Sequence, residues 1–385
     1  MSKSINIPKL RFKEFSGEWV NTKLGNLGNF QGGGTPATSE DKYWIGNIPW
    51  ISSSDIIEGD IKNIKIHRFI NDISIKESAT KLIAKNSILF VSRVGIGKVA
   101  IANTDLCTSQ DFTNLTLIKD DSYFIGYYFL SKNRLLEKYS QGTSIKGFTM
   151  NDLKTLKLNL PSKQEQEKIA SFLTSVDTKI EQLTKKEELL QQYKKSIMQK
   201  IFNQEIRFKA DDGSEFCDWE EKKLGDILDY IQPTKYLVKD TEYNDSYTIP
   251  VLTAGKTFIL GYTNETDGVF ENNLPVIIFD DFTTANKFVN FPFKAKSSAM
   301  KILVSKNNNI KFIYEAIQMI KYEVGGHERH WISKFSFLNI FIPCIEEQTK
   351  IANFLSSIDS KIEEVKKQLN STKEFKKALL QQMFV

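Results

Sequence analysis

The chain has 385 residues, 41% of them hydrophobic, and a formal net charge of +5. This length predicts two or three domains, and so small a net charge does not by itself indicate a nucleic-acid-binding protein. The three cysteines, Cys107, Cys217 and Cys344, are isolated from one another, which excludes a disulfide framework and a structural zinc site. We find no signal peptide and no apolar run long enough to cross a bilayer, so we expect a cytoplasmic protein.

Two globular segments, 1–160 and 203–342, are each followed by a long helical stretch. The globular segments share short landmarks at their starts, where Leu10-Arg11-Phe12-Lys13 matches Ile206-Arg207-Phe208-Lys209. Between such landmarks the two sequences diverge almost completely. Each segment is long enough to bury a core of its own. The order is therefore variable segment, helix, variable segment, helix.

The interior of each globular segment is mainly β-prone, with one helix near its end. Turn residues separate short runs rich in β-branched and aromatic residues. In the first segment the predicted strands are 87–92, 98–102 and 112–118, followed by an amphipathic helix over 122–139. In the second they are 275–279, 288–293 and 300–304, followed by an amphipathic helix over 309–324.

The helical stretches are two copies of one sequence, 161–202 and 343–384. Glu165-Gln166 returns as Glu347-Gln348, and a repeat of this length indicates duplication. Apolar residues recur with the heptad spacing of a coiled coil, and a proline stands just before each copy, where helices commonly begin. The seam positions that we expect to pack against the other copy or a partner protein are Ile169, Leu173, Val176, Ile180, Leu183, Ile351, Leu355, Ile358 and Ile362.

Two long helices of one chain can pack against each other in antiparallel directions, which is the arrangement we expect. The alternative is that each helix is buried against its own globular segment. The expected fold class is α+β: two mainly-β domains, 1–160 and 203–342, separated by two antiparallel coiled-coil helices, 161–202 and 343–385, with an internal pseudo-two-fold repeat.

A search for catalytic motifs finds little. Asn47-Ile48-Pro49-Trp50 loosely resembles the Asn-Pro-Pro-aromatic motif of amino-methyltransferases, but it has Ile at the second position and no glycine-rich nucleoside loop before it. Gly95-Ile96-Gly97-Lys98 lacks the spacing of a phosphate-binding loop and favours a β-turn. His67, His327 and His330 do not form a metal-ligand pattern. We therefore expect no catalytic residue and no metal site.

The remaining polar loops suit contacts with DNA. Reading base edges while holding phosphates requires polar side chains, with Lys or Arg, on exposed turns. Glycines in a loop also allow close approach of the backbone to a ligand. In the first segment the candidate DNA-binding residues are Gly33, Gly34, Thr35, Ser52, Ser54, Arg93, Lys98 and Lys146. In the second segment they are Thr283, Thr284, Asn286, Lys287, Lys296, His327, Arg329 and His330.

These features together resemble one known family. The doubled helix motif Pro-x-x-x-Glu-Gln-x-x-Ile-Ala-x-Phe-Leu and the run from Gly33-Gly34-Thr35-Pro36 to Ile51-Ser52 resemble the DNA-specificity subunit of type I restriction–modification enzymes. The resemblance covers the whole chain, and only the entry Pro343-Cys344 departs from the usual pattern.

The resemblance implies that the globular segments are target recognition domains, each reading half of a split site in double-stranded DNA. It implies that the helices bind two methyltransferase subunits that use S-adenosylmethionine to methylate adenine. A restriction and translocation subunit would use ATP and Mg²⁺, and no cofactor would bind to this chain. Two alternatives remain: a self-contained DNA adenine methyltransferase using Asn47–Trp50, and a helical scaffold that does not read DNA.

Overall fold

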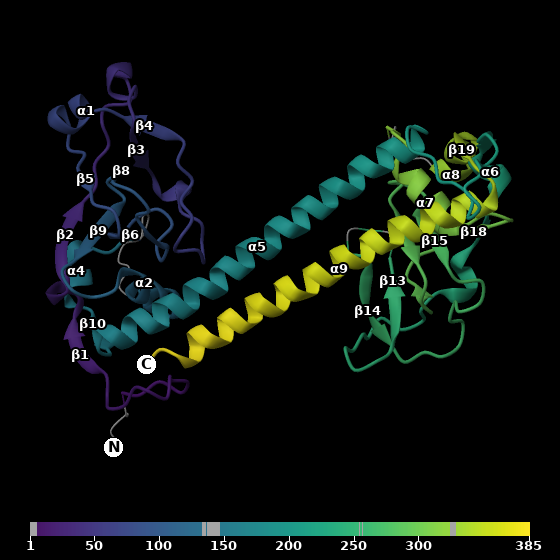
Figure 1. The fold of residues 1–385 in the computed structure, drawn as a ribbon. Coiled ribbons are helices and arrows are strands. Elements are labelled where there is room, and N and C mark those ends of the chain that lie inside the picture. The colour runs from purple at the N-terminus through teal and green to yellow at the C-terminus, as the bar shows by residue number, and fades with distance from the viewer. Residues whose placement is uncertain (1–5, 133–135, 137–146, 254, 256, 324–328) are drawn as a thin grey trace. The chain divides into compact units, whose positions relative to one another are not determined.

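The computed structural model describes residues 6–132, 136, 147–253, 255, 257–323 and 329–385 (Figure 1). The chain divides into two compact units. The first consists of Met1–Thr184 with Lys367–Val385, and the second of Lys185–Lys366. Each unit therefore contains one globular segment together with parts of both long helices.

Two four-stranded sheets build the globular part of the first unit. The first sheet is antiparallel throughout, in the order β2 (Gly28–Gly32), β9 (Phe112–Leu117), β6 (Ile88–Val91) and β7 (Val99–Ile101). The second has the order β4 (Arg68–Ile70), β3 (Ile48–Ile51), β8 (Leu106–Thr108) and β5 (Leu82–Ile83), with β3 and β8 parallel. A separate antiparallel pair, β1 (Val20–Lys23) and β10 (Lys157–Leu160), joins the start of the segment to its end.

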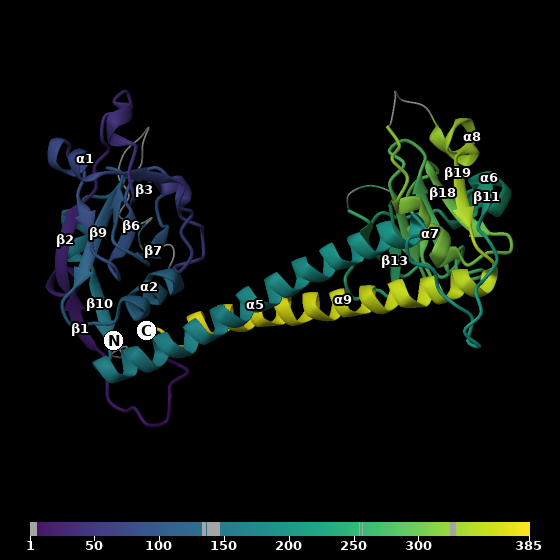
Figure 2. The ribbon, with the colours of Figure 1, turned by 45° about the horizontal axis from the view of Figure 1, so that its top comes forward.

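One short helix, α2 (Ser122–Ser131), packs against the first sheet beside β6 and β7 (Figure 2). Every residue from Phe124 to Phe129 is buried, because this helix is enclosed between the sheet and the first long helix. The other short helices of the unit are η1 (Leu24–Asn26), η2 (Asp41–Tyr43), η3 (Ser53–Asp55), α1 (Asp72–Glu77) and α4 (Met150–Thr155).

The second unit repeats this plan. Its four-stranded antiparallel sheet has the order β12 (Leu228–Ile231), β18 (Met300–Ser305), β15 (Val276–Asp280) and β16 (Asn286–Val289). A three-stranded sheet contains β14 (Ile259–Thr263), β13 (Ile249–Leu252) and β17 (Lys294–Ala295), with β13 and β17 parallel. An antiparallel pair, β11 (Glu220–Lys223) and β19 (Asn339–Ile342), again joins the start of the segment to its end. The short helices of this unit are α6 (Leu224–Ile227), η4 (Pro233–Tyr236), α7 (Ile310–Gln318), α8 (His330–Ser333) and η5 (Phe335–Phe337).

The two diverged segments therefore share one strand order in their larger sheets. β2, β9, β6 and β7 correspond in position to β12, β18, β15 and β16. The duplication, which the sequence displays in the helices and in a few short landmarks, thus extends through the larger sheets, where the side chains have changed and the strand order has not.

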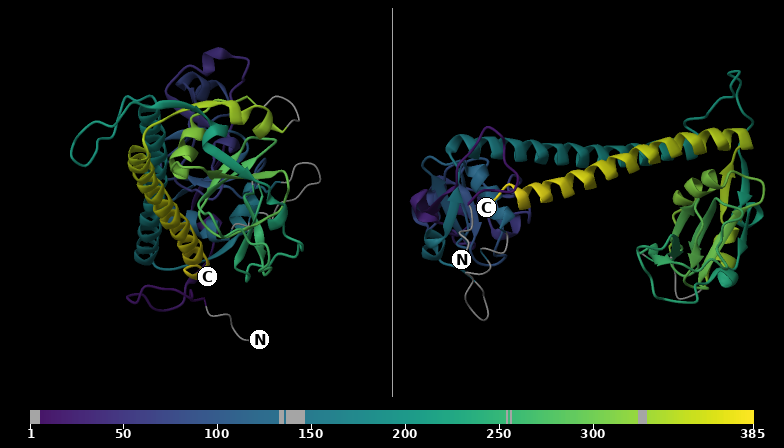
Figure 3. Two further views of the ribbon diagram at one scale, coloured as in Figure 1. Left: turned by 90° about the vertical axis from the view of Figure 1, so that its right-hand side faces the viewer. Right: turned by 90° about the horizontal axis from the view of Figure 1, so that it is seen from below.

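The long helices are α5 (Lys163–Phe202) and α9 (Ile345–Gln382). In the first unit, the beginning of α5 packs against the end of α9, and in the second unit the end of α5 packs against the beginning of α9. The two helices thus run in opposite directions within each unit. The Leu10 N–H donates to the Gln382 carbonyl at 2.9 Å, so the N-terminal segment runs past the end of α9 (Figure 3).

All nine predicted seam residues face packed surfaces, eight of them buried and Ile180 half-buried. Ile169, Leu173 and Val176 belong to one core cluster that contains Leu379 of α9 and Met383, which directly follows α9. The same cluster contains Trp19 and Phe124 of the globular part. Both packing modes considered from the sequence therefore occur together, since the first turns of α5 contact the other helix and the domain core.

Several predicted elements need correction. The predicted helix 122–139 is α2, whose burial on all sides shows that it is not amphipathic, and residues 133–135 and 137–139 lie outside the described residues. The predicted helix 309–324 is α7, which already ends at Gln318, because Met319 N–H and Ile320 N–H close its last turn on the carbonyls three residues back. The predicted strand 288–293 corresponds to β16 (Asn286–Val289), which begins two residues earlier and ends four residues earlier.

The repeated Glu-Gln dipeptide anchors each long helix to its domain, and the glutamate forms the first part of the anchor. Both oxygens of Glu165 accept hydrogen bonds from Arg11, at 2.8 Å from Nε and 2.8 Å from Nη2. Glu347 accepts the same two bonds from Arg207, each at 2.9 Å, and a third from the Trp219 indole at 3.1 Å. These two-pronged bonds are the strong form of an arginine–carboxylate pair, and they raise the pKa of both arginines.

The glutamine forms the second part of the anchor. The Gln166 side chain accepts from the Asp121 N–H at 3.0 Å and donates to Asp120 at 2.8 Å. Gln348 does the same with Asn309 N–H at 2.9 Å and Asn308 at 3.0 Å. Asp121 and Asn309 are the residues that cap α2 and α7. Each glutamine therefore fixes the start of a domain helix to the start of a long helix.

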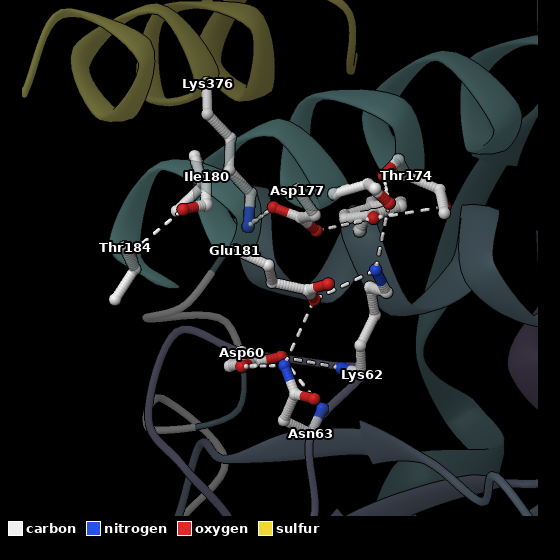
Figure 4. A network of polar contacts seen from close by, with 11 residues as sticks. Asp60, Lys62, Asn63, Thr174, Asp177, Ile180, Glu181, Thr184 and Lys376 are labelled. Atoms are coloured by element: carbon white, nitrogen blue, oxygen red, sulfur yellow. Dashed lines mark hydrogen bonds and ion pairs between the residues drawn. The ribbon is translucent and has the colours of Figure 1, made fainter. Parts of the chain in front are cut away.

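A repeated ion pair holds the two long helices together. Lys376 of α9 lies 2.6 Å from Asp177 of α5, whose other oxygen accepts from the Tyr127 hydroxyl at 2.7 Å (Figure 4). In the second unit the roles are exchanged, with Lys194 of α5 lying 2.7 Å from Asp359 of α9. The repeat relates these two pairs, because Asp177 corresponds to Asp359 and Lys194 to Lys376.

The first prediction concerns helix packing. Leu173 is fully buried, whereas Leu189 of the same helix is 52% exposed. We expect Leu173→Ala to lower the free energy of unfolding by about 2–5 kcal/mol, because it leaves a cavity in the core. Leu189→Ala is the matched control, and it should change stability by about 0.5 kcal/mol or less. Equal shifts of the urea unfolding midpoint in the two variants would contradict the observed packing.

The second prediction concerns the Arg207–Glu347 pair. Arg207→Met leaves the Glu347 carboxylate, which is fully buried, without its counter-ion. Removing one partner of a buried ion pair typically lowers the free energy of unfolding by about 3–5 kcal/mol. Lys209→Met is the control, because Lys209 forms an ion pair with Glu215 that is exposed at both ends and is expected to contribute at most about 1 kcal/mol. Thermal unfolding of both variants tests the difference, and similar melting temperatures would refute it.

The third prediction concerns pH. Burial raises the pKa of Asp359, but hydrogen bonds from Lys194 and Lys311 outweigh burial and hold it below its ordinary value of 3.8. A carboxylate with a lowered folded-state pKa stabilises the fold above its ordinary pKa, and this contribution disappears as the pH falls through the folded-state value. Asp359→Asn should therefore lower the urea midpoint at pH 7, and the difference from the unaltered protein should shrink below about pH 3.8. Exposed Asp245→Asn should show no such trend.

Candidate nucleic-acid interface

The glycines of the first predicted loop approach the protein's own backbone. A Cβ atom on Gly33 would lie 2.1 Å from the Ser109 carbonyl oxygen, and one on Gly34 would lie 2.4 Å from that of Ala79. The Gly34 carbonyl also accepts from the Trp50 indole at 3.0 Å. Thr35 beside them donates to Gln110. Close packing against the protein itself therefore requires these glycines.

Ser52, Ser54 and Lys98 come together around the η3 turn. The two serine hydroxyls lie 2.9 Å apart, and Ser52 caps the turn by bonding to Asp55. The Lys98 ammonium reaches the Ile56 carbonyl at 3.2 Å from the β6–β7 turn. Three predicted residues from two distant parts of the sequence thus share one polar surface.

Arg68 belongs to this surface and was not among the residues predicted from the sequence. Its guanidinium donates to the Ser52 hydroxyl at 2.7 Å and forms an ion pair with Asp55. A signal for it exists, since Ile64, Ile66, Arg68 and Ile70 alternate along the chain. An arginine in an apolar position of a period-two pattern faces the protein and needs a specific partner there.

The other two predicted cations of the first segment are Arg93 and Lys146. Arg93 is exposed in the turn between β6 and β7, in which Gly95 and Gly97 adopt positive φ angles of 90° and 96°. Lys146 lies outside the described residues.

In the second unit, four predicted residues lie in or beside the β15–β16 turn. Asp280 accepts from the N–H groups of Phe282 and Thr283, at 2.9 and 3.2 Å, which fixes the first half of the turn. Thr284 has a positive φ of 59°. The Asn286 side chain is held by Gln318 and by the Thr284 carbonyl, whereas Thr283 and Lys287 are exposed. This turn presents a hydroxyl and an ammonium group to solvent.

The remaining predicted residues of the second unit differ in their exposure to solvent. Arg329 is exposed, and Lys296 is half-buried with its ammonium 6.0 Å from the centre of the Tyr243 ring. His330 has no exposed surface, so its ring does not reach solvent in this structure. Its Nδ1 lies 3.0 Å from the Tyr322 hydroxyl. His327 lies outside the described residues.

The backbone of His330 is bonded to Asp281, which forms a buried ion pair with Lys301. The Asp281 carbonyl accepts from the His330 N–H at 2.8 Å, and one of its carboxylate oxygens accepts from the Trp331 N–H at 2.8 Å. Lys301, also fully buried, lies 3.6 Å from the other carboxylate oxygen. Asp281 therefore ties the turn that carries Thr283 to the segment that carries Arg329.

The first unit has neutral residues at the same places. Thr113 pairs with Phe90 as Lys301 pairs with Phe279. Ser92 follows β6 as Asp281 follows β15, and its carbonyl accepts from the Phe148 N–H at 3.1 Å. Ser92, Thr113 and Phe148 thus correspond to Asp281, Lys301 and His330. One backbone frame carries two chemically different sets of side chains.

Catalytic and metal-binding features are sparse in the part of the chain that the structure describes. Asn47 is exposed just before β3, and Trp50 is buried with its indole bonded to Gly34. Among the described residues, no group of three His, Cys, Asp or Glu side chains could hold a metal ion. The helices described here include none that is both long and apolar enough to cross a membrane.

Comparisons with known proteins agree with the internal duplication. The family described as "Type I restriction modification DNA specificity domain" matches the chain twice, at residues 16–191 and 217–373. A crystal structure of the S subunit of a type I restriction–modification system from M. genitalium has the same fold, with a TM-score of 0.69 at 19% identity, covering 98% of this chain and 99% of that one.

Two curated relatives share the sequence to different extents. The EcoR124I/EcoR124II specificity subunit of Escherichia coli is 50% identical over 39% of this chain, and the match spans only 41% of that relative's length. The MjaVIII specificity subunit of Methanocaldococcus jannaschii is 25% identical over 96% of this chain and 94% of the relative. Because the family matches both halves and most of the chain, this protein belongs to the type I restriction–modification DNA specificity family.

Proposed function

We propose that this chain is the sequence-recognition subunit of a type I restriction–modification complex. Each globular unit would read one half of a bipartite target in double-stranded DNA. The long helices would bind two modification subunits, which would use S-adenosylmethionine to methylate adenine. Restriction and translocation subunits would supply the activities that depend on ATP and Mg²⁺, and this chain would catalyse no step itself.

The main support for this proposal is that the two units share one backbone arrangement but carry different side chains on it. The backbone bonds at Ser92 and Asp281 are the same, but the side chains around them differ in charge and shape. A protein that reads two different half-sites needs such an arrangement, because base edges are distinguished by side-chain donors and acceptors rather than by the fold. The twofold match to a DNA specificity domain supports the same function.

The alternatives give different results in simple assays. The methyltransferase alternative predicts labelled methyl transfer by the purified chain alone, with loss of activity in Asn47→Ala. The scaffold alternative predicts a complex whose footprint on DNA shows no sequence preference. Our proposal predicts that the isolated chain transfers no methyl group, and that the assembled complex protects a bipartite sequence.

The fourth prediction concerns the independence of the two units. We expect Arg93→Ala to weaken binding through one half-site only, and Lys287→Ala through the other, because each exposed cation belongs to a different unit. A lost phosphate contact should weaken binding to all sequences in that half and reduce the salt slope by about one, whereas a lost base contact should relax one position at a cost of about 1–3 kcal/mol.

The measurement is competition between duplexes altered in one half-site at a time, after the methylated adenines have been mapped in a strain that expresses the complex. Each variant serves as the control for the other. A variant of one unit that changed the sequence preference in both half-sites would contradict the proposed division.

A further inference from the structure

The Arg68 side chain is held in one orientation at the edge of the first unit. Arg68 begins β4 and lies opposite Trp50 of β3. Its guanidinium carbon lies 4.6 Å from the centre of the Trp50 ring, and its Nη2 donates to Ser52 and to Asp55. The side chain remains 40% exposed, whereas that of Asp55 is only 11% exposed. Trp50, Ser52 and Asp55 thus hold the buried side of a cation that remains partly exposed.

The groups that hold Arg68 are themselves fixed. Trp50 is buried, and its indole N–H donates to the Gly34 carbonyl at 3.0 Å. Asp55 also accepts from the Ser52 N–H at 2.8 Å within the capped η3 turn. Stacking on an aromatic face and a carboxylate bond together restrict a guanidinium that would otherwise sample many rotamers.

The free side of the guanidinium is suited to a directional contact. Arginine carries five N–H donors in a planar fork, and within the described residues the bonds of Arg68 all use Nη2. The Nε–H and Nη1–H groups therefore remain to donate elsewhere. Ser54, whose hydroxyl bonds to that of Ser52, extends the same polar surface into solvent.

The ion pair with Asp55 decides between the two DNA groups that arginine commonly binds. A phosphate contact depends on net positive charge, which the carboxylate of Asp55 largely cancels here. Hydrogen bonding to a base edge depends on donor geometry, which the same carboxylate improves. The free Nε–H and Nη1–H groups can each donate to an acceptor on a base edge, and guanine presents two acceptors, O6 and N7, in the major groove.

We propose that Arg68 is a specificity-determining residue of the first unit, donating to the major-groove edge of a guanine, and that Asp55 is the positioning residue that orients it. This inference rests on the proposed function, because it requires that the first unit reads DNA. It assigns to Ser52 the role of a second support for the guanidinium.

The test uses the complex assembled with its modification subunits and a target mapped from methylated adenines. Binding is measured on duplexes in which each base pair of the target is replaced in turn. Arg68→Ala should reduce discrimination at one G·C pair of a single half-site by roughly five- to 150-fold. Arg68→Lys should reduce discrimination at the same pair, because it loses the fixed planar donors. Since this variant keeps the charge beside Asp55, its affinity for unrelated DNA and its salt slope should stay unchanged.

Two further variants separate positioning from folding. Asp55→Asn leaves the guanidinium without its counter-ion, so discrimination at the same G·C pair should fall while the salt slope becomes steeper by about one. A purely structural role would leave that slope unchanged. Lys65→Ala is the control, since Lys65 is an exposed cation three residues from Arg68, and it should not alter base preference. Unfolding midpoints of all variants show whether the fold is intact, and Arg68→Lys replaces Arg68→Ala if the latter unfolds.

Several results would overturn the proposal. One is an equal loss of affinity for all duplexes with a salt slope reduced by about one, which would indicate a phosphate contact. Others are unchanged discrimination in both Arg68 variants, and a target without a G·C pair at the half-site that they affect. If the unaltered complex shows no sequence preference at all, the proposed function fails together with this inference.

Discussion

A buried carboxylate at the start of each long helix is the constraint on which the rest of the structure depends. Glu165 and Glu347 have almost no exposed surface, and an ionised carboxylate is tolerated there only because an arginine fork meets both of its oxygens. Any rotation or shift of the helix would separate these groups and leave a charge in the core. The glutamine that follows each carboxylate accepts a hydrogen bond from the N-cap residue of a domain helix, α2 in the first unit and α7 in the second. Two consecutive side chains thus fix each helix in both rotation and position.

The candidate recognition surfaces follow from this fixed frame. In both units a β-turn at one end of the larger sheet carries exposed polar groups, and the residue that follows the central strand bonds to a distant segment. The first unit uses neutral residues beneath this point, whereas the second buries Asp281, Lys301 and His330 there. Removing either Asp281 or Lys301 would leave the other charge buried without its partner. The second surface therefore lies over a buried ion pair, whereas the first lies over neutral residues.

Sequence reasoning succeeded where one period or one repeat contained the information. The heptad spacing predicted seam residues such as Leu173 and Leu355, which are buried. Ser52, Ser54 and Lys98, predicted from turns to contact DNA, lie close together in the fold, and their contact with DNA stays a prediction. It failed where a residue's partner lies far away in sequence. His330 stands beside a glycine-rich stretch that suggested an exposed loop, yet Asp281, which follows a strand about fifty residues earlier, bonds to its backbone and keeps it buried. Arg68 was not predicted because the orientation of its side chain depends on contacts with Trp50 and Asp55. Helix α2 was misjudged because an apolar periodicity does not show how many faces will be covered.

The shared main-chain bonds at Ser92 and Asp281 have a consequence for how such a protein can diverge. The Phe148 N–H and the His330 N–H make the same bond to the residue after the central strand, although no side chain is retained at either end. A bond between backbone groups makes no demand on side-chain identity, apart from excluding proline at the donor position. Mutations at these places can therefore keep the main-chain bond, provided that buried charged partners such as Asp281 and Lys301 change together. The chain can in this way acquire new specificities on an unchanged scaffold.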